Sequence, residues 1–269
     1  MAFDSQAVRV FEHAGWQQAA AHYTATFAQA TLGFVDALLD AARVGAGMRV
    51  LDLACGSGLV AAAAVGRRAL PVGLDFSSAM IALARAEHPG IHFEEGDAEI
   101  LPFADEAFDA VVAIFGIHHV PDPIRALSEA RRVLRPGGRV AFTSWAAPTE
   151  NIAWRLLFEA IAANGDLKAA DTPPPGGSLR LPEDLLRALN SAGFTESEAK
   201  RAHCEWCVAT PGSLVEGFRR GTVRTAALID AQPAAALPLI EAAHSVAAYR
   251  RADGFAIPIV AVIASGVRG

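Results

Sequence analysis

The chain of 269 residues lacks the features that mark several classes of protein. It has no apolar run near the roughly 20 residues that a membrane-spanning helix needs. Its first residues, Met1 to Gln6, have neither the basic flank nor the apolar stretch of a signal peptide. Lys and Arg never cluster beyond a pair, and the formal charge is −6, whereas nucleic-acid binding needs concentrated positive charge. We therefore expect a cytoplasmic globular protein with no membrane or nucleic-acid partner; the sequence does not indicate an oligomeric state.

Cysteine is also scarce, with residues only at positions 55, 204 and 207. Three cysteines do not make a disulfide framework. Cys204 and Cys207 have the C-x-x-C spacing, but no second pair and no histidine pair accompanies them, so a tetrahedral zinc site would lack ligands. We expect no metal.

What the chain does contain is a glycine turn between an apolar run and an alanine-rich segment, over residues 49–61. Short apolar runs bounded by glycine favour buried strands, and the alanines that follow favour a helix. Gly56 and Gly58 have no Cβ, so the backbone can approach a ligand closely, and the helix behind them presents free N–H groups. This pattern is typical of a loop that binds a small molecule.

From residue 48 to about 144 the pattern alternates between strand and helix. Strands are expected at 48–53, 70–74, 91–95, 108–114 and 138–144, and helices at 58–67, 77–86 and 123–134. Such alternation predicts parallel βαβ units in a doubly wound α/β fold, with ligands at the carboxyl ends of the strands. Aspartates occupy three of these ends, at positions 52, 75 and 97.

Outside this core we expect a single domain with additions. Residues 1–46 form an N-terminal helical cap in two pieces, 47–144 the cofactor-binding core, 145–197 an insertion with helices at 152–163 and 181–192, and 198–269 the C-terminal strands and helices. Strands are expected at 198–208 and 257–264, with helices at about 211–230 and 233–247. Pro258 has no N–H, which predicts that it lies at the very start of the last strand.

The glycine turn alone is compatible with two classes of enzyme. Gly56, Gly58 and Asp75 also resemble the dinucleotide fingerprint and its ribose-binding carboxylate. Asp52, however, lies four residues before Gly56, where a dianionic pyrophosphate would sit, and the repulsion would cost on the order of a few kcal/mol at close range. A cationic or zwitterionic ligand fits better.

Five motifs in the order and spacing of one family carry a more specific resemblance: VLDLACGSGL (50–59), GLDFSSAM (73–80), GDAEILPF (96–103), FDAVVAIFGIHHVPD (108–122) and VLRPGGR (133–139). They resemble the class I S-adenosylmethionine-dependent methyltransferases, in particular the small-molecule enzymes similar to the ubiquinone/menaquinone C-methyltransferases. The resemblance implies a Rossmann-like, seven-stranded, mostly parallel sheet whose last strand runs antiparallel beside the fifth. It covers about residues 50–140 and thins outside them.

The resemblance also implies roles for individual residues. Asp52 would lie near the ammonium of S-adenosylmethionine, Asp75 would accept hydrogen bonds from the ribose hydroxyls, and Asp97 would accept from the adenine amino group. Family members often carry glycine where Ala54 stands, so this loop is expected to lie slightly farther from the ligand. The full set of expected cofactor-binding residues is Asp52, Ala54, Gly56, Gly58, Asp75, Phe76, Met80, Asp97, Ala98, Glu99, Ile114, Phe115 and Tyr23.

His118 and His119 are the candidates for catalysis. Histidine titrates near neutrality and could take a proton from the acceptor as the methyl group arrives; alternatively, each is a satisfied histidine beneath the cap. The cap itself is either a packed amphipathic element or a lid that brings Trp16 or Tyr23 over the ligand.

We therefore expect methyl transfer from S-adenosylmethionine to a small organic acceptor by in-line displacement. Two alternatives remain: an NAD(P)-dependent oxidoreductase, and a non-catalytic protein that binds S-adenosylmethionine. The identity of the acceptor, and whether carbon, nitrogen or oxygen is methylated, do not follow from the sequence.

Overall fold

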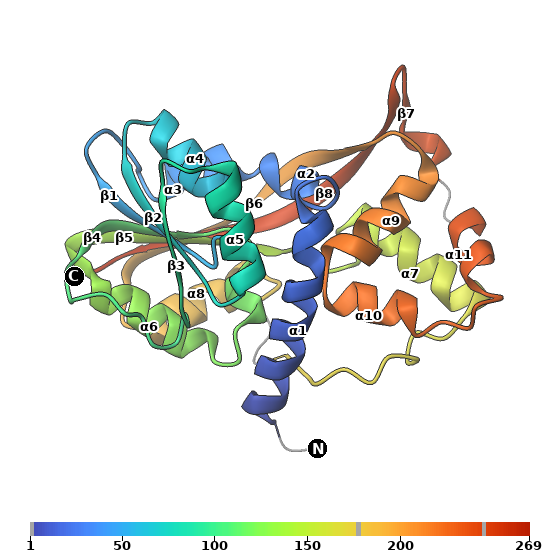
Figure 1. Ribbon diagram of the computed structural model, residues 1–269, viewed down its shortest axis with the longest axis horizontal. Helices are drawn as coiled ribbons and strands as arrows, with labels where there is room; N and C mark the ends of the chain where they lie inside the picture. The colour runs from blue at the N-terminus through green and yellow to red at the C-terminus, as the bar shows by residue number, and fades with distance from the viewer. Residues whose placement is uncertain (1–2, 176–178, 244–245) are drawn as a thin grey trace.

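The computed structural model describes residues 3–175, 179–243 and 246–269 and shows a twisted sheet with a helical lobe beside it (Figure 1). The strand order is β3-β2-β1-β4-β5-β8-β6, and one more short strand, β7, pairs with β8 outside this order. Among the described strands, the antiparallel pairs all involve β8, which pairs with β5, β6 and β7. The expected mostly parallel sheet, with the last strand antiparallel beside the fifth, is therefore confirmed apart from the extra β7. The strands are β1 (Arg49–Leu53), β2 (Leu70–Asp75), β3 (His92–Glu95), β4 (Phe108–Ala113), β5 (Leu134–Trp145), β6 (Thr195–Val208), β7 (Arg250–Arg251) and β8 (Gly254–Val267).

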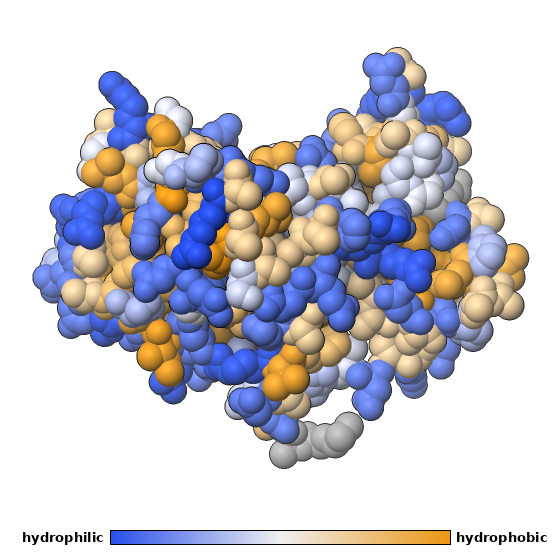
Figure 2. All heavy atoms as spheres, in the orientation of Figure 1, coloured by the Kyte–Doolittle hydropathy of each residue, from blue (hydrophilic) through white to orange (hydrophobic). Residues whose placement is uncertain are grey.

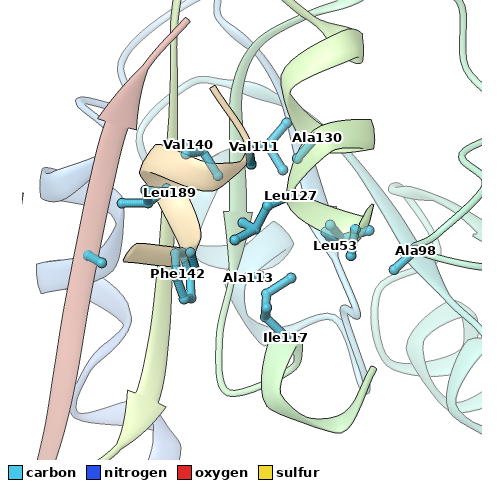
Figure 3. Packing of buried hydrophobic residues seen from close by; sticks show 14 of the residues in the cluster. Leu53, Ala98, Val111, Ala113, Ile117, Leu127, Ala130, Val140, Phe142 and Leu189 are labelled. Atoms are coloured by element: carbon cyan, nitrogen blue, oxygen red, sulfur yellow. The ribbon is translucent and has the colours of Figure 1, made fainter. Parts of the chain in front are cut away.

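Helices cover both faces of the sheet because each central strand is buried on both sides. On one face, α4 (Leu59–Gly66) and α5 (Ser78–Glu87) pack against β1, β2 and β3, and α3 (Val35–Ala41) packs against β5 and β8. On the other face lie α6 (Pro123–Val133) and α8 (Pro182–Ser191). Figure 3 shows Leu127 and Leu189 from these two helices packed close to Val111 and Phe142 of β4 and β5.

A second lobe of helices stands on the far halves of β6 and β8, which extend beyond β5 (Figure 1). Its core combines aromatic residues of both strands and helices, including Trp206 and Phe218. The predicted helix at 152–163 is confirmed and belongs to this lobe. The helices of the lobe are α7 (Ile152–Asn164), α9 (Pro211–Gly221), α10 (Arg224–Asp230) and α11 (Leu237–Ala243), followed by the short η2 (Ala247–Tyr249).

The N-terminal segment forms three helices rather than two: α1 (Ser5–Tyr23), α2 (Ala28–Leu32) and α3. Asp4 starts α1 by accepting hydrogen bonds from the backbone N–H groups of Gln6 and Ala7. α1 then runs between the sheet and the helical lobe, where it contacts α5 on one side and α9 on the other (Figure 1). None of the described helices is long and apolar enough to cross a membrane.

Two expectations about the C-terminal part were wrong. Pro258 lies inside β8, not at its start. The carbonyl of Val260 points toward β5, where it accepts a hydrogen bond from Ala146 N. Backbone groups two residues apart in a strand point the same way, so the nitrogen of Pro258 also points toward the β5 side. At that position β5 has already ended. Among the described strands, none lies beside Pro258 on that side to accept a hydrogen bond, so the missing N–H costs nothing. The expected helix at about 211–230 is broken into α9 and α10, because Thr222 is extended.

The surface drawn in Figure 2 mixes hydrophilic and hydrophobic residues in small groups over both lobes. Large hydrophobic residues that are exposed, such as Val65 in α4, Ile100 in the loop after β3 and Leu239 in α11, are far apart in the chain. Scattered exposed residues of this kind are ordinary. The apolar surface that needs a functional explanation is therefore inside the molecule.

Candidate active site

A cavity of about 310 Å³ lies where the carboxyl ends of the parallel strands meet α1 and the helical lobe. The turns after β1, β2 and β4 supply one wall. α1, the loop after β3, the end of β5, α7 and the junction between α9 and α10 supply most of the rest. In an open α/β sheet this is the position where ligands bind. The break that separates α9 from α10 brings Thr222, Val223 and Arg224 onto the cavity wall.

The glycine turn contributes two kinds of backbone position. Ala54 (φ 55°) and Gly56 (φ 53°) are both left-handed and both line the cavity. A Cβ at Gly56 would have no neighbour closer than 4.0 Å, so it would occupy cavity space. Gly58 does not line the cavity; a Cβ there would lie 2.6 Å from the ring of Phe93. Gly58 is needed for packing, and Gly56 leaves room for a ligand.

Asp75 ends β2 with its carboxylate held by the backbone. Its Oδ2 accepts from Gly56 N and its Oδ1 from Ser77 N, both at 2.9 Å. Burial raises its pKa, and these two hydrogen bonds act in the opposite direction. The carboxylate lines the cavity, so two of its acceptor positions are fixed by the protein and the others are available to a ligand.

Asp52 lies behind the glycine turn and does not line the cavity. It is fully buried; Oδ2 accepts from Ala61 N at 2.9 Å, while Oδ1 has no partner among the described residues. Burial raises its pKa to about 8, and the negative charge of Asp75 adds to this effect. Tyr23 is partly buried near these carboxylates and Thr31, and desolvation raises its pKa to about 12.

The aspartate after β3 is paired with α1. Arg9 of α1 forms ion pairs with Asp97 and with Glu99, whose Oε1 also accepts from Asp122 N at 2.7 Å. Asp97 and Ala98 line the cavity, whereas Glu99 does not. Glu99 therefore connects α1 to the loop before α6, and Asp97 faces the cavity with an arginine on one side.

Aromatic rings form the opposite wall. Phe115 (φ 52°), just after β4, stacks on Trp145 with ring centroids 3.8 Å apart. Trp154 of α7 and Phe27 lie within 6 Å of Trp145, and all four rings line the cavity. A non-glycine residue held in a left-handed conformation at a cavity is strained, and such strain is concentrated at functional sites.

The two histidines lie in η1 (Ile117–His119), directly after β4, and both line the cavity. His119 Nδ1 is 2.9 Å from Glu12 Oε2, and Glu12 Oε1 accepts from Arg224 Nε at 2.6 Å. His118 is 3.5 Å from the hydroxyl of Ser144, and burial, with the charges of His119 and two arginines, holds its pKa well below the usual range. His118 is thus neutral at neutral pH.

The structure brings most of the expected cofactor residues to one cavity. Asp52, Gly58 and Glu99 are close to it but do not line it. Trp145 and Arg180 also line the cavity, whereas His13 packs edge-on against Phe76. The expected residues that do line it are Ala54, Gly56, Asp75, Phe76, Met80, Asp97, Ala98, Ile114, Phe115 and Tyr23.

Sequence reasoning missed Glu12 and Arg224. A lone glutamate in a helix is usually a solvated residue, and α10 was expected to continue α9. The partners of Glu12 are 107 and 212 residues away, so no local pattern could reveal them. The one signal was the polar-aromatic composition of residues 11–23, for which a lid was one of two interpretations.

Comparison with known proteins agrees with this geometry. Residues 51–142 match the family model described as "Methyltransferase domain". A demethylmenaquinone methyltransferase of Renibacterium salmoninarum is 40% identical over 112 residues, which are 42% of this chain and 47% of that protein. The chain thus spans about half the length of the curated relatives it matches. The resemblance to class I S-adenosylmethionine-dependent methyltransferases is confirmed over this core.

Solved structures extend the likeness beyond the core at the level of fold. A protein of Anabaena variabilis, described as a methyltransferase from an antibiotic biosynthesis pathway, aligns with a TM-score of 0.61 over 86% of this chain and 95% of its own, at 15% identity. The [4+2]-cyclase SpnF aligns with a TM-score of 0.52 over 87% and 79%, at 23% identity. A cyclase and a methyltransferase catalyse different reactions, so the shared fold does not by itself define the chemistry.

Proposed function

We propose, from the match of residues 51–142 to a methyltransferase domain, that the protein transfers a methyl group from S-adenosylmethionine to a small organic acceptor. The observation that carries this proposal is Asp75, a strand-end carboxylate fixed by two backbone N–H groups on the wall of the cavity. The apolar surroundings and the net charge of −6 support a small molecule, rather than a polyanion, as the partner. We also propose that the protein acts in the cytoplasm.

The residues present fit the cofactor. Gly56 leaves space for the methionine part, Asp75 would accept from the ribose hydroxyls, and Asp97 with the Ala98 N–H would contact the adenine. Asp52 lies behind the turn and has one buried oxygen without a hydrogen-bond partner among the described residues; when ionised, it would attract the ammonium group of the cofactor across the turn. When bound, the cofactor supplies an activated methyl group on a sulfonium.

The acceptor would bind against the aromatic wall, where Trp145, Trp154 and Phe115 offer apolar ring faces. The names of the curated relatives point the same way, since a demethylmenaquinone is a quinone and so contains a ring. We therefore propose an apolar, ring-bearing acceptor. Trp16 and Tyr23 of α1, which also line the cavity, would close over it as a lid.

His119 is the better of the two candidate bases. Its Nδ1 is engaged by Glu12, and the described residues give no hydrogen bond to its Nε2. His118 would remain neutral and orient the acceptor, together with Ser144. General-base assistance of this kind contributes about 10²- to 10⁴-fold in rate.

Isothermal titration with S-adenosylmethionine and with NAD tests the assignment. We expect micromolar-range binding of S-adenosylmethionine only, lost in Asp75→Ala and retained in the exposed control Asp253→Ala. Binding of NAD alone would favour an oxidoreductase. Binding of S-adenosylmethionine without methyl transfer to any compound in a panel of ring-bearing acceptors would favour a binding protein or a different reaction.

A further inference from the structure

Glu12 is the most unusual charged residue of the lid helix. It lies in α1 with a side chain that is 0% exposed, yet both of its oxygens are engaged by side chains from other elements. Burial disfavours its charge, but His119 and Arg224 outweigh this and lower its pKa, so Glu12 is ionised at neutral pH. A buried carboxylate in this state accepts hydrogen bonds and donates none.

Arg224 is held in place on three sides. Its Nε donates to Glu12, its Nη1 donates to the carbonyl of Pro173 at 2.6 Å, and its guanidinium lies over the ring of Phe11, 5.4 Å from the centroid. Arginine only donates. Its side chain therefore requires an acceptor atom at the position of Glu12 Oε1.

We infer that Glu12 is a positioning residue that fixes the tautomer of His119, and that Arg224 fixes the orientation of Glu12. A carboxylate at Nδ1 requires the proton on Nδ1, which leaves the lone pair on Nε2. This inference rests on the proposed function, in which His119 is the base. The base is thus assembled from α1, η1 and α10, and it is complete only when the lid helix is in place.

The arrangement also narrows the class of acceptor. A base with a free lone pair is useful where the attacking atom carries a weakly acidic proton, as in a ring hydroxyl or an activated carbon. In that step the acceptor's proton moves to Nε2, and its electron pair forms the bond to the methyl carbon. The electron pair of the broken carbon–sulfur bond stays on the sulfur of the departing thioether.

Glu12→Gln provides a sharp test because glutamine has the same shape but two unlike ends. Arg224 Nε can only donate, so it takes the amide oxygen and turns the NH₂ group toward His119 Nδ1. His119 then has to accept at Nδ1 and carry its proton on Nε2. Removing the donor in Glu12→Gln/Arg224→Met lets the amide rotate, so that either tautomer of His119 can pair with it.

The tautomer is read from the ¹⁵N chemical shifts of His119 in alkaline buffer, assigned by loss of the signal in His119→Gln. We expect the Nδ1–H form in the natural protein, the Nε2–H form in Glu12→Gln, and a mixture with more Nδ1–H than in Glu12→Gln in the double variant. With an acceptor that is turned over, kcat of Glu12→Gln falls by about 10²-fold or more while KM for S-adenosylmethionine stays the same. Glu12→Asp, which keeps a pure acceptor, retains the Nδ1–H form.

The matched control is Glu159→Gln, which changes an exposed glutamate that also pairs with an arginine, Arg155. It should leave both the tautomer and kcat unchanged. An unchanged tautomer in Glu12→Gln, or full kcat in that variant, overturns the inference. Because the ¹⁵N measurement needs no turnover, failure of the inference is distinguishable from failure of the proposed methyl transfer.

Discussion

The backbone at Ala54 carries strain at the point where a ligand would approach. Its φ of 55° lies in the left-handed region, which costs an L-residue roughly 1–2 kcal/mol. The Cβ of Ala54 also occupies the space that a side chain at Gly116 would need. The glycine that family members often have at this position would remove both constraints.

Ala54→Gly is therefore expected to stabilise the protein by up to about 1 kcal/mol, because relief of the left-handed strain exceeds the entropy that glycine adds to the unfolded chain. It should also tighten S-adenosylmethionine binding, since the turn can move closer to the ligand. Urea denaturation and isothermal titration measure the two effects. A loss of stability would show that the methyl group of Ala54 contributes more through packing than its backbone costs.

Asp52 makes the stability of the free protein depend on pH. Its carboxyl has a pKa of about 8 when folded and an ordinary value of 3.8. Between these two values the folded state keeps a proton that the unfolded chain has lost, so the free energy of unfolding falls as pH rises through this window. Glu12 affects stability in the opposite direction. Its pKa is lowered in the folded protein, so its contribution to the free energy of unfolding is lost as pH falls through that lowered pKa.

In Asp52→Asn we expect higher stability than in the natural protein near pH 8, and a flatter dependence between pH 4 and pH 8. The same change should weaken S-adenosylmethionine binding by about tenfold, or about 1.4 kcal/mol, because Asp52 can lose its proton when an ammonium binds nearby and asparagine cannot ionise. Denaturation at a series of pH values and titration with the cofactor provide the measurements. A parallel pH profile for both proteins would contradict the raised pKa.

At the scale of elements, α9 packs closely against β6 at a glycine. Gly217 of α9 faces Trp206 of β6, and a Cβ on this glycine would lie 2.5 Å from the indole ring. Trp206 is 1% exposed and cannot easily move. Gly66, in α4, has no neighbour within 4 Å of such a Cβ.

Gly217→Ala should therefore destabilise the protein by about 1–3 kcal/mol through overpacking. Gly66→Ala, the same change in open space, should be neutral or stabilising by up to about 1 kcal/mol because alanine favours helix. Equilibrium denaturation of both variants compares them directly. Equal effects in the two variants would mean that α9 moves away from β6 at little cost.

The sequence predicted the elements whose signals are local. Alternating apolar runs and helices identified β1 to β5 and α4 to α6, and the aspartates at strand ends identified one wall of the cavity. The break at Thr222 was not predicted, although its hydroxyl donates to the Phe218 carbonyl and accepts from Ala226 N, which ends one helix and starts the next. Glu12 and Arg224 depend on the packing of distant segments, which periodicity does not report.

At the scale of the molecule, the cavity joins two bodies through α1. The sheet contributes Asp75 and Asp97, the helical lobe contributes Trp154 and Arg224, and α1 contacts both. A ligand in the cavity would bind to both bodies at once. Its free energy of binding therefore stabilises their association as well as each local contact.

S-adenosylmethionine is accordingly expected to slow backbone hydrogen exchange in α1 and α10 together, although α10 is not part of the family core. Exchange in α6, which packs on the opposite face of the sheet, should change little. Mass spectrometry of exchanged peptides measures all three helices in one experiment. Protection of α1 without α10 would indicate that the lobe does not respond to the cofactor.

The position of β8 has a consequence for synthesis. β8 lies between β5 and β6, and among the described strands it is the only neighbour of β6. Until residues 254–267 leave the ribosome, β5 therefore presents an unpaired edge and β6 has nothing to pair with, while the helices between them are already complete. An exposed strand edge of this kind invites pairing with another chain. The nascent protein thus depends on its last strand, or on a chaperone, to remain unaggregated.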